Sequence, residues 1–168
     1  MNLLRYAFLP FCLMPFQAMA ETTTLVIPDQ GWALTFEAPP LRPVRETDSN
    51  DHYMYSANAN NFAISLYVDT PACTGGESHE AVLNCFWPKA GKDPLINQAS
   101  VSKSCSQQYC KISYDFENTF QGAPIRQKHI HFLFAYRERW SNLHAAVSNP
   151  TENDLKLLEA FASSVSYQ

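Results

Sequence analysis

Three histidines in the second half of the sequence have the spacing of a metal site on a sheet. His129 and His131 lie two residues apart in a long alternating run that predicts a strand over residues 125–137. Side chains two apart on a strand point to the same face, and a tight turn near Glu138 would place His131 opposite His144 on the next strand. Three imidazoles on one face could hold zinc or copper. The alternative is that the three histidines simply occupy the less apolar face of a hairpin. A register shift of one residue would remove His144 from the cluster.

Cysteine is the second residue type that could carry chemistry. Five cysteines are present, and removal of the N-terminal segment that contains Cys12 would leave Cys73, Cys85, Cys105 and Cys110. An even number of cysteines in an exported chain indicates disulfides. Of the three pairings that four cysteines allow, we expect the local one, Cys73 with Cys85 and Cys105 with Cys110. The alternative is a four-cysteine zinc site, which the spacing disfavours because no C-x-x-C pair is present.

The first twenty residues have the features of a secretory signal peptide. Arg5 supplies the positive charge, an apolar stretch follows over residues 6–16, and Ala18-Met19-Ala20 provides the small residues of a cleavage site. A membrane anchor is the alternative, and it is disfavoured because the stretch is shorter than the roughly 20 residues that a spanning helix needs. We expect residues 1–20 to be cleaved, leaving residues 21–168 as one periplasmic or secreted domain without a transmembrane segment.

The composition excludes several classes of function. The chain has 168 residues, of which 46% are hydrophobic and 17% are charged, so it is too apolar for a disordered protein. Its net charge of −4 and its lack of a basic run argue against a nucleic-acid partner. The sequence also lacks a G-x-S-x-G elbow, an H-E-x-x-H motif and a phosphate-binding glycine loop. We therefore expect no catalytic residues, no cofactor and a non-enzymatic role.

Alternation of apolar and polar residues predicts the strands that would position these side chains. Strands are expected over residues 22–27, 32–37, 53–56, 62–68, 99–105, 109–117, 125–137 and 140–147. Three prolines make residues 38–43 an extended connector. With two helices, this order predicts an α+β sandwich with a mainly antiparallel β-sheet of about seven to eight strands.

Capping residues mark the two helices. Ser78 is expected to cap a short helix from His79 to Trp87, which Pro88 would end. Asn149 is expected to cap a C-terminal helix, with Pro150 in its first position. Apolar residues at helical spacing would pack this second helix on the sheet.

Two segments, at the start and at the end of the predicted domain, carry a family resemblance. They are Gly31-Trp32-Ala33-Leu34-Thr35-Phe36 and Trp140-Ser141-Asn142-Leu143-His144-Ala145, the second leading into Leu155–Phe161 and Ser163-Ser164-Val165. In these segments and in the order of its elements the sequence resembles the PsbP/DcrB-like family of small exported domains. The resemblance implies an antiparallel sheet flanked by helices, and accessory, assembly or binding roles at the envelope. The two cysteine pairs depart from the family pattern.

A recognition surface is the leading functional hypothesis. Tyr53, Tyr55 and Asn58 combine rigid aromatic area with an adaptable amide, which suits protein recognition, and Trp87 could be a second anchor. Alternatively, the tyrosines fill one face of a hairpin and Trp87 fills the core. We expect a non-enzymatic protein-binding module of the bacterial cell envelope. Its most specific form is a periplasmic immunity protein that neutralises a secreted toxin.

Two other functions stay open. The first is a periplasmic carrier of a small ligand or metal that uses the face of His129, His131 and His144. The second is an envelope hydrolase without a readable motif, for which the acid pairs Glu77/Glu80 and Asp115/Glu117 are the candidates.

Overall fold

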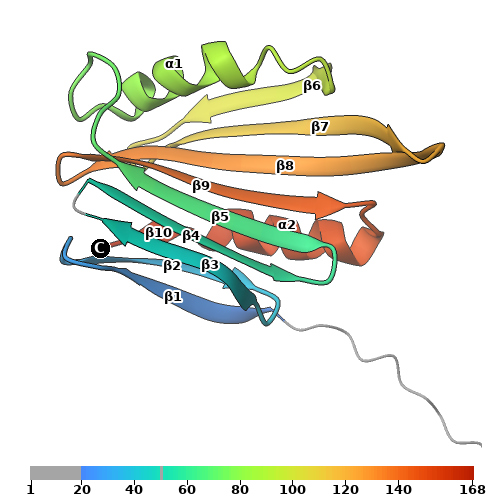
Figure 1. Ribbon diagram of the computed structural model, residues 1–168, viewed down its shortest axis with the longest axis horizontal. Coiled ribbons are helices and arrows are strands. Elements are labelled where there is room, and N and C mark those ends of the chain that lie inside the picture. The colour runs from blue at the N-terminus through green and yellow to red at the C-terminus, as the bar shows by residue number, and fades with distance from the viewer. Residues whose placement is uncertain (1–19, 50) are drawn as a thin grey trace, which may run out of the picture.

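The described part of the chain folds into ten strands and two helices. The computed structural model describes residues 20–49 and 51–168, so the predicted signal peptide lies outside the described residues except for Ala20. The elements follow one another as β1 (Glu21–Ile27), β2 (Trp32–Ala38), β3 (Arg42–Ser49), β4 (His52–Ala59), β5 (Phe62–Asp69), α1 (His79–Ala90), β6 (Ile96–Cys105), β7 (Cys110–Phe120), β8 (Ala123–Tyr136), β9 (Arg139–Ser148), α2 (Glu152–Ser164) and β10 (Ser166–Tyr167) (Figure 1). No helix among these elements is long and apolar enough to cross a membrane.

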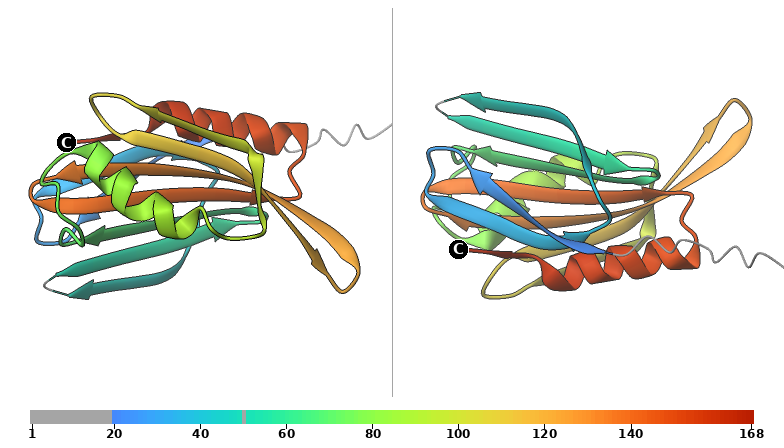
Figure 2. Two further views of the ribbon diagram at one scale, coloured as in Figure 1. Left: turned by 90° about the horizontal axis from the view of Figure 1, so that it is seen from above. Right: turned by 90° about the horizontal axis from the view of Figure 1, so that it is seen from below.

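Two antiparallel sheets form the domain. Seven strands pair in the order β3-β4-β5-β9-β8-β7-β6, and the remaining three pair in the order β1-β2-β10. Helix α1 covers one face of the large sheet, over β7 and β8, whereas α2 and the small sheet cover the opposite face (Figure 2). The predicted fold class, an α+β sandwich with a mainly antiparallel sheet and two helices, is confirmed.

The main core lies between the two sheets and α2. Strands β2 and β5 bury every second residue, as their alternation predicts. Phe36 of β2, Phe132 of β8 and Phe161 of α2 are completely buried. The ring of Phe161 meets those of Phe36 and Phe132 edge to face, at centroid distances of 5.2 and 5.8 Å. This is a favourable arrangement for aromatic pairs, so α2 is held to both sheets.

A second, smaller core lies between α1 and the opposite face of the large sheet. Val82 of α1 packs there with Ile112, Leu133 and Trp140, which come from β7, β8 and β9. Because α1 packs mainly against β8, the next two strands in the sheet, β9 and β5, are not fully covered by the helix. This difference in cover creates the groove described below.

Both disulfides join the predicted cysteines. The bond between Cys73 and Cys85 ties the loop before α1 to the helix, and the two Cα atoms are 6.0 Å apart. The bond between Cys105 and Cys110 closes the turn between β6 and β7, with Cα atoms 4.0 Å apart. The local pairing is therefore confirmed.

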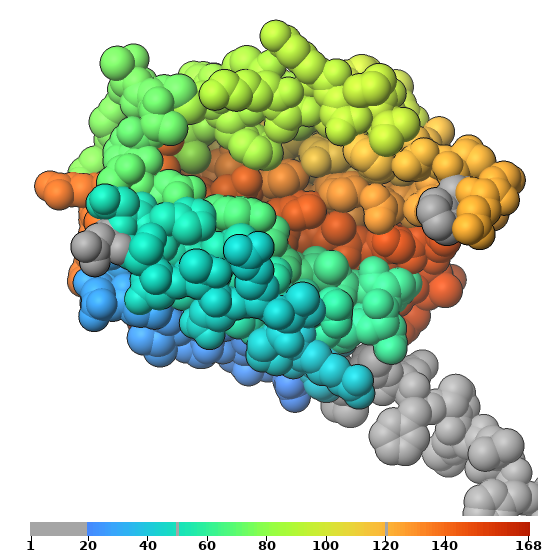
Figure 3. Space-filling model, in the orientation of Figure 1, coloured from blue at the N-terminus to red at the C-terminus, as the bar shows by residue number. Residues whose placement is uncertain are grey.

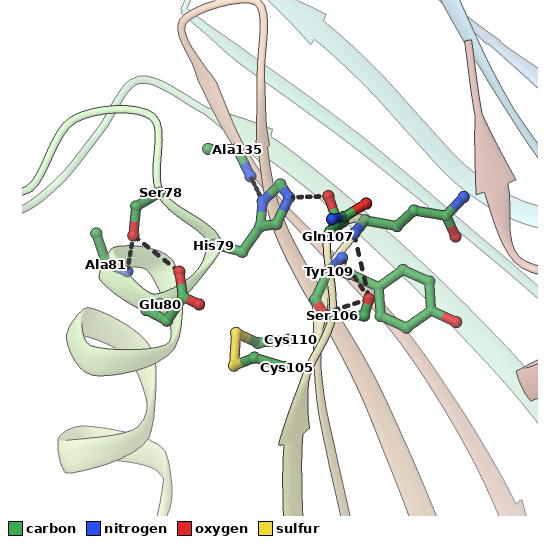
Figure 4. Close-up of a disulfide and its surroundings, with 11 residues drawn as sticks. Ser78, His79, Glu80, Ala81, Cys105, Ser106, Gln107, Tyr109, Cys110 and Ala135 are labelled. Atoms are coloured by element: carbon green, nitrogen blue, oxygen red, sulfur yellow. Dashed lines mark hydrogen bonds between the residues drawn. A yellow bond between two sulfur atoms is a disulfide. The ribbon is translucent and has the colours of Figure 1, made fainter.

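His79 fastens the first turn of α1 to the sheet. Its Nδ1 accepts a hydrogen bond from the backbone N–H of Ala135 on β8, and its Nε2 donates to the carbonyl oxygen of Gln107 in the β6–β7 turn (Figure 4). Both ring nitrogens are thus used in positioning the helix.

Helix α1 begins where predicted but ends later. Ser78 is its N-cap, and the Ser78 hydroxyl accepts a hydrogen bond from the backbone N–H of Ala81. The expectation that Pro88 ends the helix is wrong, since the helix continues to Ala90. A proline removes one backbone donor, and so close to the helix end the last turn is completed by the N–H of Gly91, which bonds to the Trp87 carbonyl oxygen.

Helix α2 begins two residues later than predicted. Its N-cap is Thr151, which forms a reciprocal capping box with Asp154. Asn149, the predicted cap, has a φ of 46° and lies in the preceding turn. Its side-chain oxygen accepts a hydrogen bond from the backbone N–H of Arg126. Asparagine tolerates left-handed backbone, which explains its place in the turn.

Strand β3 was not predicted. It begins at Arg42, inside the segment 38–43 that was expected to be a connector, and it pairs only with β4 at the edge of the large sheet. Nearly all of its residues are exposed, so no apolar alternation marks it. Its bulge between Pro43 and Arg45 fits an edge strand, where a proline leaves no ladder partner unsatisfied. With the two-residue strand β10, β3 raises the strand number above the expected seven or eight.

Candidate functional site

The structure brings the three predicted histidines together on one face of the large sheet. His131 on β8 pairs directly with His144 on β9, in the register that a turn near Glu138 predicts. The rings of His131 and His144 stack with centroids 4.3 Å apart, and those of His129 and His144 stack at 5.0 Å. Tyr114 of β7 stacks on His129, also at 5.0 Å. We call these four rings the histidine stack.

Hydrogen bonds fix the proton positions of His131. Its Nδ1 lies 3.0 Å from Oδ1 of Asn142, and an amide oxygen only accepts, so Nδ1 carries a proton. Its Nε2 lies 3.0 Å from the Tyr114 hydroxyl and accepts a hydrogen bond from it. With one proton on Nδ1, His131 is satisfied in its neutral form, and the protein uses both of its ring nitrogens.

The other two histidines form a second chain of hydrogen bonds. Nε2 of His129 lies 3.3 Å from the amide oxygen of Gln127, so this nitrogen donates. Nδ1 of His129 then accepts a hydrogen bond from Nε2 of His144 across 2.8 Å. Nδ1 of His144 lies 3.5 Å from the hydroxyl of Ser65 on β5. The chain crosses three neighbouring strands, and one proton on each imidazole is enough to form it.

Burial favours this neutral state. It lowers the pKa of His129 to about 4, although the nearby carboxylate of Asp115 opposes the shift. Burial also lowers the pKa of His131 to about 4, against the opposing hydrogen bond to Asn142. The pKa of His144 lies well below its ordinary value, because the ring is buried and because positive charge on His131 or His129 would repel a further proton.

Metal binding by the histidine stack stays a prediction, and the geometry shows what it would require. Zinc binds imidazole nitrogens at about 2.0–2.1 Å, so an ion between His129 and His144 would have to replace the hydrogen bond that joins them. A different group of possible metal ligands lies close together within residues 20–49 and 51–168. It consists of Glu80, Cys105 and Cys110, whose ligand atoms all lie within 4.8 Å of one another. Both sulfur atoms of that group belong to a disulfide, as Figure 4 shows.

The predicted recognition residues do not form one exposed surface. Tyr53 and Tyr55 point into the main core and are only 4% and 7% exposed, so the expectation that they lie on the surface is wrong. Asn58 is exposed on the same strand. Trp87 is half-buried and packs against the second core, with the Lys103 ammonium 4.7 Å from its ring centroid. The alternation of β4 explains the burial of both tyrosines, because they occupy its inward positions.

A groove runs beside α1 on the same face of the sheet as the histidine stack. It has a volume of about 590 Å³ and is bordered by α1, β5, β8, β9 and the loop after β5. Its main side chains are Tyr67, Val82, Phe86, Lys89, Leu133, Trp140 and Asn142. In Figure 3, atoms of β8 and β9 are visible between α1 at the top and β3 to β5 below. We call this hollow the α1 groove.

Asn142 connects the histidine stack with the α1 groove. On β9 it pairs with Tyr67 of β5 on one side and with Leu133 of β8 on the other, and both of these residues also line the groove. Its side-chain oxygen accepts the hydrogen bond from His131. Phe86 of α1 makes a second connection, since its ring centroid is 5.0 Å from that of His131.

The α1 groove was not predicted from the sequence. A partial signal was present, because the outward positions of β5 include Tyr67, which is 39% exposed, and Asp69. The missing information is where α1 crosses the sheet, since periodicity shows that a face is covered but not which strands the helix covers.

Comparison with known proteins shows a shared fold. No protein-family model matches the sequence, and no curated protein is significantly similar to it. Among solved structures, the chain is similar to LpqN of Mycobacterium tuberculosis, a protein described as involved in cell envelope biogenesis. The TM-score is 0.52 at 11% identity, over 89% of this chain and 91% of LpqN. At this identity the likeness concerns the fold alone.

A second solved structure, of a protein from Bacteroides thetaiotaomicron, is similar over 90% of this chain and 49% of its own. Its TM-score is 0.48 and its identity is 8%. The resemblance to the PsbP/DcrB-like family stays a prediction from the sequence pattern, since no family model matches.

Proposed function

We propose that residues 21–168 form a non-enzymatic binding module of the bacterial cell envelope, with the α1 groove as its binding site. The groove itself carries the proposal. Its volume of about 590 Å³ and its walls of aromatic and aliphatic side chains are typical of binding sites, which usually add only a few polar groups. The buried histidines beside it, with their lowered pKa values, are a further feature that gathers at functional sites.

The envelope location rests on three supports. The N-terminal segment has the pattern of a signal peptide. The two disulfides fit an oxidising compartment. LpqN, which shares the fold, is described as involved in cell envelope biogenesis. Together they support a periplasmic or secreted protein.

A protein is the first candidate partner, and a secreted toxin is its most specific form. An aromatic or aliphatic side chain of such a partner would enter the α1 groove as an anchor, which is how most binding energy is concentrated in protein interfaces. The acidic net charge, −4 for the full chain, would speed association with a basic partner. The groove replaces the hairpin of Tyr53 and Tyr55 as the expected contact surface, because those rings are buried.

A pull-down tests the protein-partner version. The tagged, disulfide-intact mature domain is incubated with envelope and secreted fractions, and captured proteins are read by mass spectrometry. Ala90→Phe adds a ring in the wall of the groove, and Val44→Phe adds the same ring on β3, where the side chain is 63% exposed. We expect one stoichiometric partner that the first variant loses and the second retains. A partner kept by both variants would contradict binding at the groove.

A small ligand is the second candidate, and the size of the α1 groove favours it. A volume of about 590 Å³ lies inside the range of roughly 300–1,000 Å³ that is usual for small-molecule sites. Such a carrier would be stabilised by its ligand in a thermal melt, because the ligand binds only the folded state. Stabilisation by a metabolite mixture that Ala90→Phe abolishes would support this version.

A further inference from the structure

The floor of the α1 groove offers a hydrogen-bond donor that the histidine stack holds in place. Oδ1 of Asn142 accepts from Nδ1 of His131, which is itself fixed by the Tyr114 hydroxyl. The amide of Asn142 is planar, so its Nδ2 group is directed away from His131 and keeps two protons to donate. Asn142 lies between Tyr67 and Leu133, which both line the groove. A ligand group at this position must therefore accept hydrogen bonds.

The wall of the groove supplies a positive charge. Lys89 lies in the last turn of α1 and lines the groove, and its ammonium has no ion-pair partner within residues 20–49 and 51–168. The other charged side chain of the lining is Asp69, whose carboxylate is hydrogen-bonded to Nδ1 of His52. The cation of Lys89 is thus available to a ligand, whereas the anion of Asp69 is already engaged.

The apolar part of the lining is rich in rings. Tyr67, Phe86 and Trp140 reach the groove from β5, α1 and β9, so a bound ring would meet aromatic surface from three elements. Aromatic pairs in stacked or edge-to-face contact add to the energy of simple burial.

We propose that the α1 groove binds small aromatic carboxylic acids, with the ring among Tyr67, Phe86 and Trp140 and the carboxylate between Asn142 Nδ2 and the Lys89 ammonium. The inference rests on the small-ligand version of the proposed function and names its ligand class. A carboxylate fits because it accepts hydrogen bonds from both groups and because its negative charge pairs with the Lys89 ammonium. An amine would meet two donors at the same position.

Three probes with the same ring test the charge preference. Indole-3-acetate, indole-3-ethanol and tryptamine carry an anion, a neutral hydroxyl and a cation on an indole side chain, and calorimetry measures their binding to the disulfide-intact mature domain. We expect indole-3-acetate to bind roughly two- to fivefold more tightly than indole-3-ethanol, the difference typical of one added charge pair at an exposed ammonium, and tryptamine to bind weakest.

Variants of the two polar groups sharpen the test. Lys89→Gln should remove most of the preference for the acid, while Lys92→Gln, an exposed charge just beyond the helix that does not line the groove, should leave it unchanged. Asn142→Asp keeps the oxygen that accepts from His131 but replaces the donor with a second acceptor. This variant should cancel most of the preference for indole-3-acetate, because the new carboxylate repels that of the probe while the Lys89 ammonium still attracts it.

The outcomes separate the inference from the function it rests on. Equal binding of the three probes, lost in Ala90→Phe, would overturn the acid preference and keep the groove as a small-ligand site. No heat from any probe at roughly 1 mM, where binding energy is only about 4 kcal/mol, would overturn both the acid class and the small-ligand version for aromatic molecules. Preference for the acid that Lys89→Gln and Asn142→Asp leave unchanged would place its binding elsewhere and contradict the proposal.

Discussion

Nδ1 of His129 accepts a hydrogen bond from Nε2 of His144 across 2.8 Å, and the planes of the two rings differ by only 6°. In this direction the bond needs an unprotonated Nδ1 on His129. A second proton on His129 would either leave two N–H donors facing each other in a buried place or force His144 to move its own proton from Nε2 to Nδ1, and it would place a charge where burial makes it costly. The histidine stack is therefore stable as a neutral unit, and acid is the condition that opposes it.

The domain is expected to lose stability as the pH falls from about 6.5 to about 4. A histidine in the unfolded chain takes up its proton near pH 6.5, whereas the pKa of His129 and of His131 in the folded domain is lowered to about 4. The unfolded state thus binds more protons across this window, and each such histidine reduces the free energy of unfolding by about 1.4 kcal/mol per pH unit. Urea denaturation at successive pH values measures the slope.

A variant tests whether the histidine stack causes this pH dependence of the free energy of unfolding. His144→Gln removes one proton that unfolding takes up, so its stability should fall less steeply over the same pH window, whatever its stability at neutral pH. Equal slopes for the two proteins, or a stability that stays constant down to pH 5, would contradict the neutral stack.

Tyr114 is expected to stabilise the stack through its hydroxyl. Tyr114→Phe leaves Nε2 of His131 buried without the donor that now lies 3.0 Å away, a loss that costs about 1–3 kcal/mol. Tyr67→Phe is the matched control, because it removes the hydroxyl of a tyrosine that is 39% exposed. Urea unfolding at neutral pH should show a clear loss for the first variant and almost none for the second. A similar decrease in the free energy of unfolding for both variants would mean that the Tyr114 hydroxyl stabilises the domain no more than an exposed hydroxyl does.

Strands with one buried face were predictable from the sequence, because burial imposes a period of two. The pairing of His131 with His144 followed from the same pattern and a tight turn, and the structure has this register. Disulfide pairing was predictable because each pair is close in sequence. In contrast, the polar edge strand β3 buries almost nothing and leaves no periodic signal.

Exposure was harder to predict than strand position. The period of β4 shows that Tyr53 and Tyr55 share a face, but not whether that face is the core or the surface. The α1 groove depends on contacts between residues distant in sequence, such as Phe86 with His131. Local pattern carries no information about where a helix crosses a sheet, so the site that we propose required the structure.

Zinc titration tests whether the stack binds metal, as the sequence suggested. We expect no saturable heat at tens of micromolar zinc, because the His129–His144 hydrogen bond would have to be broken first. The same titration with copper extends the test to the other predicted metal. Saturable heat that His144→Gln abolishes would support the metal-carrier alternative instead.

The two disulfides are expected to contribute differently to stability and to binding. Replacing Cys73 and Cys85 by alanine opens a link across 12 residues and should cost about 3 kcal/mol, whereas replacing Cys105 and Cys110, 5 residues apart, should cost about 2 kcal/mol from the loop alone. Cys85 also lines the α1 groove, and its bond holds the loop that borders the groove beside β5. The first double variant should therefore weaken binding of indole-3-acetate, and the second should leave it close to that of the parent domain. Calorimetry on both, at a temperature where each is folded, makes the comparison. Equal affinity in the two double variants would show that the Cys73–Cys85 bond has no specific effect on the groove.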